Sequence, residues 1–360
     1  MTNAGLEGVV VADTKISDVD GERGKLVIAG ADVEQLAAAT SFEGAVSRVL
    51  AAGGAPEGTI TPAMISAARA AAWELMPRLG DALDHPDGMD ALRTALGHLR
   101  VTGGEVSAAA GAVAAVAAIG AAPVFVAAWS RRRAGLPAIA PDPAATHAAD
   151  YLRMTIGRVA PEDAVRALDA YLVTVIDHAM SASTFTARVI ASTHSDLISA
   201  MVGAVGALKG PLHGGAPGPV LDMLDAIGAP ANAEAWLLAE LAAGRRIMGM
   251  GHRVYRVRDP RAAVLETAVR PLMSPRLELA RAVERAAAKI LRDKKPDRPL
   301  AANVEFYTAV LLDAVGLPRE QFAPTSADRM RRRSARIPTP RARGRRRADR
   351  ARDKYGGPCP

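Results

Sequence analysis

The feature that most constrains the fold of this chain is a series of alanine-rich segments with leucine-type spacing, which recur between glycine and proline residues. Such spacing places apolar side chains on one face of a helix, and Ala and Leu have high helix propensity. Aromatic residues make up only 4% of the 360 residues, so aliphatic side chains must fill most of the core. The sequence therefore predicts an all-α fold, with helices over 33–39, 63–79, 161–180, 232–243 and 277–294.

The N-terminal residues are the exception to this helical pattern. Runs of β type at 8–12 and 25–29 flank a turn signal at 18–24, which predicts a short extended lead-in before the first helix. A second unusual segment, residues 106–130, carries no charge. It is rich in Ala and Gly and contains Pro123, so we expect a buried core helix rather than a membrane span.

The net charge of +7 is concentrated at the C-terminal end. Residues 329–360 contain twelve Arg and one Lys against two Asp, a net charge of +11, which leaves −4 for residues 1–328. From about Pro324 onward, regular apolar spacing gives way to Arg, Pro, Ala and Gly, a composition that cannot bury a core. We expect a slightly acidic folded body followed by an Arg-rich, disordered tail.

Cysteine usage and short motifs exclude several classes of protein. Cys359 is the single cysteine, so an intrachain disulfide and a cysteine-based metal site are excluded. The N-terminal residues lack the basic opening and apolar run of a secretory signal, and we expect a cytoplasmic protein. No P-loop, strand-linked GxGxxG, HExxH or GxSxG motif is present, so metal, dinucleotide and hydrolase chemistry have no support.

His213 lies in a glycine-rich segment, KGPLHGGAPGPVLDML. Pro211 and the neighbouring glycines end one helix, and a new helix is expected from about Pro217. A histidine just before a helix faces backbone N–H groups and the positive end of the helix dipole, which favours its neutral form. A neutral imidazole can donate a hydrogen bond to a developing enolate oxygen. A turn histidine that only caps the next helix is the alternative.

His252 lies in RRIMGMGHRVYRVRDPRA, where six arginines accompany one acid, Asp259. Gly249 and Gly251 allow the backbone to approach a ligand closely. Arginines crowded together repel one another unless anions neutralise them, and Arg binds carboxylates and phosphates through a planar fork of donors. The segment predicts an anion-binding loop, with a solvated basic loop as the alternative.

His178 and Glu305 are two further candidates. His178 is expected toward the end of an apolar helix, before a Ser/Thr-rich break at 181–184 that can cap the next helix; such a histidine is typical of a satisfied core residue. Glu305 is flanked by apolar and aromatic residues at an expected helix start. Burial there would raise the pKa of its carboxyl group and make it a better proton acceptor, whereas a carboxylate that only stabilises the helix dipole is the alternative.

Taken together, and in this order, GPLHGGA, MGMGHRVYRVRDPRA and NVEFYTAVLL resemble the three active-site segments of the citrate synthase family. The resemblance extends from about Gly5 to Phe322. It implies the citrate synthase fold, a large helical domain and a smaller helical domain with the active site in the cleft between them. The implied boundaries are 1–214 for the first part of the large domain, 215–320 for the small domain, and 321–360 for the return to the large domain, here replaced by the tail.

The resemblance also implies catalytic roles for three residues. His213 matches the histidine that stabilises the enol of acetyl-CoA, and His252 matches the histidine that polarises and protonates the ketone of oxaloacetate. Glu305 occupies the position of the carboxylate that removes the α-proton. Relatives usually have Asp there, so the backbone must absorb one extra methylene.

Three further residues match binding positions of the family. Arg261 corresponds to an arginine that binds a carboxylate of oxaloacetate. His178 corresponds to a substrate-binding histidine, although this chain has DHAMSAST where relatives often have DHELNAST. Arg256 resembles a basic residue near the phosphates of coenzyme A.

The implied activity is condensation of acetyl-CoA with oxaloacetate and water to give citrate and CoA. The CoA thioester would be a co-substrate, no cofactor would be permanently bound, and the protein would be a homodimer without a membrane or a specific nucleic acid as partner. One alternative is a 2-methylcitrate synthase that uses propionyl-CoA and shares every motif quoted above. The other is an inactive helical protein whose basic tail binds polyanions without specificity.

The tail departs from the family pattern. Where this chain has the tail, relatives have a long apolar helix that carries another substrate-binding arginine. An abrupt change to Arg, Pro, Ala and Gly is what a shifted reading frame in GC-rich DNA would produce. We therefore interpret residues from Arg329 onward as a frameshifted or mispredicted terminus.

Overall fold

The computed structural model describes residues 13–100, 108–210, 217–294 and 300–328. Within these ranges the chain is mostly helical, as the sequence predicts. The α-helices are α1 (Val33–Ala39), α2 (Phe42–Ala52), α3 (Pro62–Glu74), α4 (Gly88–Leu96), α5 (Ala108–Arg133), α6 (His147–Ile156), α7 (Glu162–Thr174), α8 (Ala182–Ser192), α9 (Leu197–Leu208), α10 (Pro217–Ile227), α11 (Ala233–Ala242), α12 (Pro260–Val269), α13 (Pro275–Lys294), α14 (Val304–Ala314) and α15 (Phe322–Asp328). Short 3₁₀ helices are η1 (Met76–Arg78), η2 (Ala82–Asp84), η3 (Pro230–Asn232), η4 (Arg270–Leu272) and η5 (Arg319–Gln321).

A small antiparallel sheet precedes the helices. Its strands are β1 (Ser17–Asp20), β2 (Lys25–Ile28) and β3 (Ala31–Asp32), in the order β1-β2-β3. The expected strand at 25–29 is confirmed, but the expected turn at 18–24 is too long, since β1 continues through Asp20. The carboxylate of Asp20 accepts hydrogen bonds from the backbone N–H groups of Glu22 and Arg23, so the turn closes within four residues. The run at 8–12 lies outside the described residues.

Helix α5 is the core helix expected from the uncharged segment. It is long and apolar enough to cross a membrane, with a mean hydropathy of 2.1, but 72% of that apolar window is buried inside the protein. Pro123 lies within it and is itself buried. Small side chains let neighbouring helices approach closely: at Gly120, an added Cβ would lie 2.5 Å from the Cβ of Ala68 in α3.

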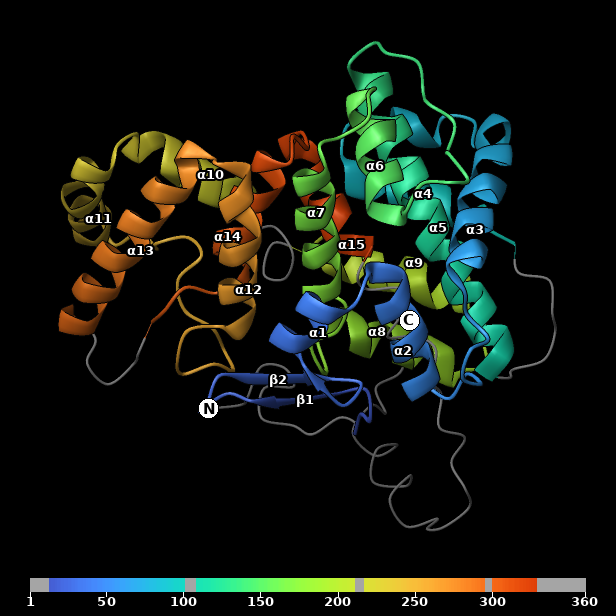
Figure 1. The fold of residues 1–360 in the computed structure, drawn as a ribbon, viewed down its shortest axis with the longest axis horizontal. Helices are drawn as coiled ribbons and strands as arrows, with labels where there is room; N and C mark the ends of the chain where they lie inside the picture. Colours follow the sequence, from blue (N-terminus) through green and yellow to red (C-terminus); the bar gives the residue numbers. More distant parts are fainter. Residues whose placement is uncertain (1–12, 101–107, 211–216, 295–299, 329–360) are drawn as a thin grey trace, which may run out of the picture.

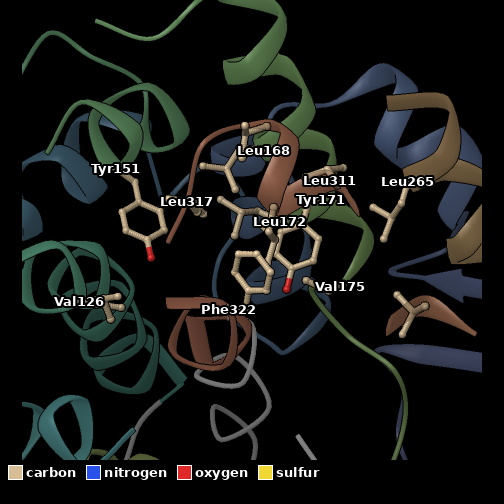
Figure 2. Packing of buried hydrophobic residues seen from close by; sticks show 14 of the residues in the cluster. Val126, Tyr151, Leu168, Tyr171, Leu172, Val175, Leu265, Leu311, Leu317 and Phe322 are labelled. Carbon is tan, nitrogen blue, oxygen red and sulfur yellow. The ribbon is translucent and has the colours of Figure 1, made fainter. Parts of the chain in front are cut away.

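Figure 1 shows α3 to α6 on one side of the molecule and α10, α11 and α13 on the other, with α7 between them. Helix α12 packs against both α7 and α14. Leu168, Tyr171 and Leu172 of α7 pack with Leu311 of α14 and Phe322 of α15 (Figure 2), and all five side chains are buried. Helix α7 is therefore central to the core, and its C-terminal end leads directly to His178.

Helix ends show where local signals hold and where tertiary contacts override them. Helix α8 begins after Ser181, whose hydroxyl accepts a hydrogen bond from Thr184 N, as the sequence predicts. The prediction of a helix over 161–180 was wrong at its C-terminal end, because α7 stops at Thr174. His178 therefore lies in the loop between α7 and α8. This loop includes Ala179 with a left-handed φ of 50°.

Candidate active site

Two segments that are far apart in the sequence are joined by backbone hydrogen bonds. Gly251 N donates to Ala301 O at 2.7 Å, and Asn303 N donates to Gly249 O at 2.9 Å. The side-chain nitrogen Nδ2 of Asn303 adds a hydrogen bond to Gly251 O at 2.9 Å. We call residues 249–251 and 301–303 the loop frame. His252 directly follows one strand of the frame and Glu305 lies two residues beyond the other, so the frame fixes their separation.

The two glycines of the frame are required by its backbone. Gly249 and Gly251 have φ angles of 72° and 86°, a region that favours glycine. A Cβ at Gly249 would lie 2.8 Å from the side chain of Phe306, and one at Gly251 would lie 2.7 Å from Leu300. At both positions the close approach described here is to the protein's own chain, and the approach of a ligand to these glycines stays a prediction.

His252 is held as a neutral imidazole with a defined tautomer. Its Nδ1 accepts hydrogen bonds from the backbone N–H groups of Val254 (3.0 Å) and Tyr255 (3.2 Å). Since a backbone N–H can only donate, Nδ1 carries no proton, and the proton of the neutral ring is on Nε2. Burial lowers the pKa of His252 to about 4, and the positive charge of Arg261 acts in the same direction. At neutral pH the ring is an uncharged donor through Nε2.

Arg261 is buried beside its own N-cap residue. Its Nε and Nη2 donate to the two carboxylate oxygens of Asp259 at 2.9 and 2.7 Å, and both residues are at most 3% exposed. Burial alone would lower the pKa of Arg261, but the charge and hydrogen bonds of Asp259 outweigh it, and Glu305 also raises the pKa. Asp259 additionally accepts from Val304 N at 3.1 Å, so the arginine is tied to the start of α14.

His178, from the loop between α7 and α8, lies next to His252 and Tyr255. Its Nε2 lies 3.1 Å from the hydroxyl of Tyr255, and its ring meets that of His252 edge-on with centroids 5.4 Å apart. The loop of His178 is anchored by Asp177, whose carboxylate accepts from the hydroxyl of Ser17 in β1 and from Ala179 N. The bond between Asp177 and Ser17 joins residues 160 positions apart, so no local sequence pattern predicts it.

Glu305 is half-buried in the first turn of α14, as the sequence predicts. Its backbone N–H donates to Oδ1 of Asn303 at 3.0 Å, so Asn303 caps the helix. The neighbouring Val304 and Phe306 are buried. The carboxylate therefore lies at the edge of an apolar region, close enough to Arg261 for the two charges to interact.

The arginines of this segment are mostly neutralised by acids from elsewhere in the chain. Arg258 donates to Glu266 and Glu284, and Arg245 pairs with Glu240. Arg256 is half-exposed, with its nitrogen 3.8 Å from a carboxylate oxygen of Glu22 in the β1–β2 turn. The expectation of a self-repelling cluster is revised, because it counted only acids that are near in sequence.

The structure brings together His178, His252, Arg261 and Glu305, and places Arg256 at the periphery. His213 lies outside the described residues. Sequence reasoning did not single out Tyr255, Asp259 and Asn303 as site residues. Asp259 and Asn303 could have been found as helix N-caps, since each precedes a helix start, but nothing local marks Tyr255.

Other parts of the described structure offer no comparable acid–base site. Within the described ranges, no group of three His, Cys, Asp or Glu side chains is arranged to hold a metal ion. A groove of about 430 Å³ lies between α1, α7 and α12. It is lined mainly by alanines, and the ionisable residues at it are Glu34, Asp163 and Arg166. It contains no imidazole, so the histidine cluster is the better candidate for acid–base chemistry.

Comparison with known sequences agrees with this geometry. The sequence model of the family described as citrate synthase, C-terminal domain, matches residues 5–330. The chain belongs to the citrate synthase family. It is 38% identical over 315 residues to a putative citrate synthase 2 of Mycobacterium tuberculosis, covering 87% of this chain and 82% of the relative. It is 40% identical over 269 residues to a 2-methylcitrate synthase of the same species, covering 74% and 68%.

Solved structures of the family have the same fold. Citrate synthase from Thermotoga maritima superposes with a TM-score of 0.80 at 31% identity, covering 93% of this chain and 90% of that one. The Thermoplasma acidophilum citrate synthase in ternary complex with carboxymethyl coenzyme A and oxaloacetate superposes with a TM-score of 0.79 at 25% identity, covering 91% of this chain and 88% of that one. The expected citrate synthase fold is thus confirmed.

Proposed function

We propose that this chain condenses acetyl-CoA with oxaloacetate and water to give citrate and CoA. One observation carries the proposal: the neutral His252, with its proton on Nε2, is fixed by the loop frame relative to Glu305 and beside the buried Arg261. These are a hydrogen-bond donor for a ketone, a candidate base and a cation for a carboxylate. The CoA thioester is a co-substrate, and the chemistry calls for no permanently bound cofactor.

In the proposed mechanism, Glu305 removes a proton from the methyl group of acetyl-CoA. A thioester α-proton is weakly acidic, so its removal requires stabilisation of the enol oxygen at the same time; we assign this role to His213 from the family resemblance. The enol carbon then attacks the ketone carbon of oxaloacetate, while His252 donates from Nε2 to the ketone oxygen. Water finally cleaves the thioester and releases citrate and CoA.

Arg261 and His178 would bind oxaloacetate. Arg261 uses two of its five N–H donors on Asp259, so Nη1 retains donors for a substrate carboxylate. His178 would bind the diacid from the opposite loop. Arg256 is proposed, from resemblance alone, to contact the phosphates of CoA, and its partly exposed side chain is suited to that role.

The test is a thiol-release assay with acetyl-CoA and oxaloacetate, comparing wild type with Glu305→Gln. Gln keeps the size of the side chain but cannot accept the proton, so the turnover rate should fall by roughly 10²–10⁴-fold. Glu34→Gln is the matched control, since Glu34 is an exposed acid in the first turn of α1, and its rate should be unchanged. A Glu305→Gln enzyme with wild-type turnover would contradict the assignment.

The second candidate is a 2-methylcitrate synthase, which the 40% identity to such an enzyme favours. The two reactions differ by one methyl group on the thioester, which a pocket discriminates by about 1–3 kcal/mol. We propose acetyl-CoA as the preferred substrate because the longer match is to a putative citrate synthase. Specificity constants for acetyl-CoA and propionyl-CoA, measured side by side, decide between them.

The assembly is proposed as a homodimer located in the cytoplasm. Residues 1–214 would form the first part of the large domain and residues 215–320 the small domain, while an Arg-rich tail at 321–360 would replace the return to the large domain. Val113 of α5 and Val189 of α8 are 48% and 47% exposed, so their apolar side chains are available to contact a second subunit. Light scattering should give twice the chain mass of 37.4 kDa. A mass equal to one chain would contradict the dimer.

The Arg-rich terminus is proposed to result from a shifted reading frame. Its net charge of +11 over 32 residues, set against −4 for the rest of the chain, supports this. Sequencing the locus and measuring the intact mass of the native protein test it, and an unshifted frame ending at Pro360 would contradict it. Absence of turnover together with salt-dependent DNA binding would favour the inactive, polyanion-binding alternative.

A further inference from the structure

Tyr255 lies against three residues of the candidate active site: His178, His252 and Arg261. Its side chain is 2% exposed, and its hydroxyl lies 3.1 Å from Nε2 of His178. Its ring centroid is 4.8 Å from that of His252, and the guanidinium of Arg261 lies 5.9 Å from the ring centroid. A single buried residue thus lies against both histidines and the arginine.

The hydroxyl contact spans two distant parts of the chain. His178 belongs to the loop after α7, whereas Tyr255 lies in the segment between the loop frame and α12. A tyrosine hydroxyl can both donate and accept, so whichever tautomer His178 adopts, the bond sets the rotation of the imidazole ring. The rotation of that ring determines which direction His178 presents to a ligand between it and His252.

The loop of His178 does not depend on this bond for its position. Ser17 and Ala179 N both donate to the carboxylate of Asp177, and Ala179 N also contacts the hydroxyl of Ser17 at 2.8 Å. These bonds fix the backbone on either side of His178. Loss of the Tyr255 hydroxyl should therefore change the orientation of one ring and leave the loop in place.

We propose that Tyr255 is a positioning residue for oxaloacetate, whose hydroxyl holds His178 at the angle the diacid requires. This inference rests on the proposed function. In this role Tyr255 does not act as an acid or a base on the substrate. It acts only by orienting His178. The packing of its ring against His252 and Arg261 is a separate contribution that the hydroxyl does not affect.

The experiment compares Tyr255→Phe with wild type by calorimetric titration with oxaloacetate and by steady-state kinetics. Phe keeps the ring and removes only the hydroxyl. A neutral hydrogen bond contributes about 0.5–1.5 kcal/mol, so Kd and KM for oxaloacetate should rise by about 3- to 10-fold, while KM for acetyl-CoA should stay within about twofold. Tyr151→Phe is the matched control, because Tyr151 is equally buried and its hydroxyl bonds Gln321 and Thr325.

A double-mutant cycle with His178→Ala separates positioning from general destabilisation. If Tyr255 acts through His178, removing its hydroxyl should have no further effect on oxaloacetate affinity once the imidazole is absent. An equal loss of affinity in both backgrounds overturns the inference, as does an unchanged affinity in Tyr255→Phe or a loss of the same size in Tyr151→Phe.

Failure of the proposed function is recognised separately. A wild-type protein that binds oxaloacetate but turns over neither thioester contradicts the proposed activity, and the calorimetric cycle still tests Tyr255. A wild-type protein that does not bind oxaloacetate overturns the positioning role as well.

Discussion

Replacing His252 with Asn should remove a pH-dependent loss of stability. Oδ1 of Asn can accept the two backbone N–H bonds that now reach Nδ1 of His252, but the side chain cannot ionise. In the folded protein, burial and the charge of Arg261 lower the pKa of His252 from 6.5 to about 4. Because the unfolded chain binds the proton more readily, the wild type loses stability as the pH falls from about 6.5 to about 4.

The size of this effect follows from the shift. A difference of about 2.5 pKa units corresponds to about 3 kcal/mol when complete, and about 2 kcal/mol should be lost by pH 5. The free energy of unfolding, from urea titrations at pH 7, 6 and 5, should therefore fall more steeply for the wild type than for His252→Asn. Other titrating groups contribute equally to both proteins and cancel in the difference.

Two results would refute the reasoning about His252. Parallel stability curves for the two proteins would mean that the folded and unfolded pKa values are alike. A histidine NMR resonance assigned to His252 that titrates near pH 6.5 would show directly that burial and Arg261 do not lower its pKa. The environment would then not favour the neutral ring, which is the premise of the predicted stability difference.

Two further predictions concern the stability of the fold. Burial raises the pKa of Asp169 to about 6, so ionisation of this carboxyl group destabilises the fold as the pH rises from about 4 to 6. Asp169→Asn should therefore stabilise the protein by about 1–3 kcal/mol above pH 6. Urea unfolding at pH 4 and 7.5 should show this gain only at the higher pH. At Gly21, an added Cβ would lie 2.3 Å from Val254 O, so Gly21→Ala should lower the unfolding free energy by about 1–3 kcal/mol. Gly218→Ala is the control, because a Cβ added there would meet no atom within 4 Å beyond its own helix backbone and chain neighbours. Thermal denaturation should show no comparable loss for this control.

Most of the helical architecture could be predicted from the sequence because its signals are local. The span of α1 matches the predicted 33–39, and α11 and α13 differ from their predictions by only one or two residues. The prediction ended α7 too late, and it could not include the bond between Asp177 and Ser17 that anchors the loop after this helix. These residues are 160 positions apart, and no periodicity reports such a contact.

The candidate site was predictable residue by residue but not as an electrostatic environment. The motifs named His252, Arg261 and Glu305, and in the structure Arg261 lies near both other residues; their roles stay a prediction. No local pattern indicates that Glu284 neutralises Arg258, because that acid lies on α13. Tyr255 was overlooked for the same reason, since its partner His178 comes from a separate loop.

The loop frame has a consequence for how this protein can move. Because backbone bonds join residues 249–251 to 301–303, a rotation of α12 and α14 relative to α7 would carry His252 and Glu305 together as one rigid unit. Their mutual spacing would survive such a rotation, and only their distance to His178 would change. Such a rotation would thus separate the groups proposed to bind the diacid, while the two groups proposed to transfer protons would stay together.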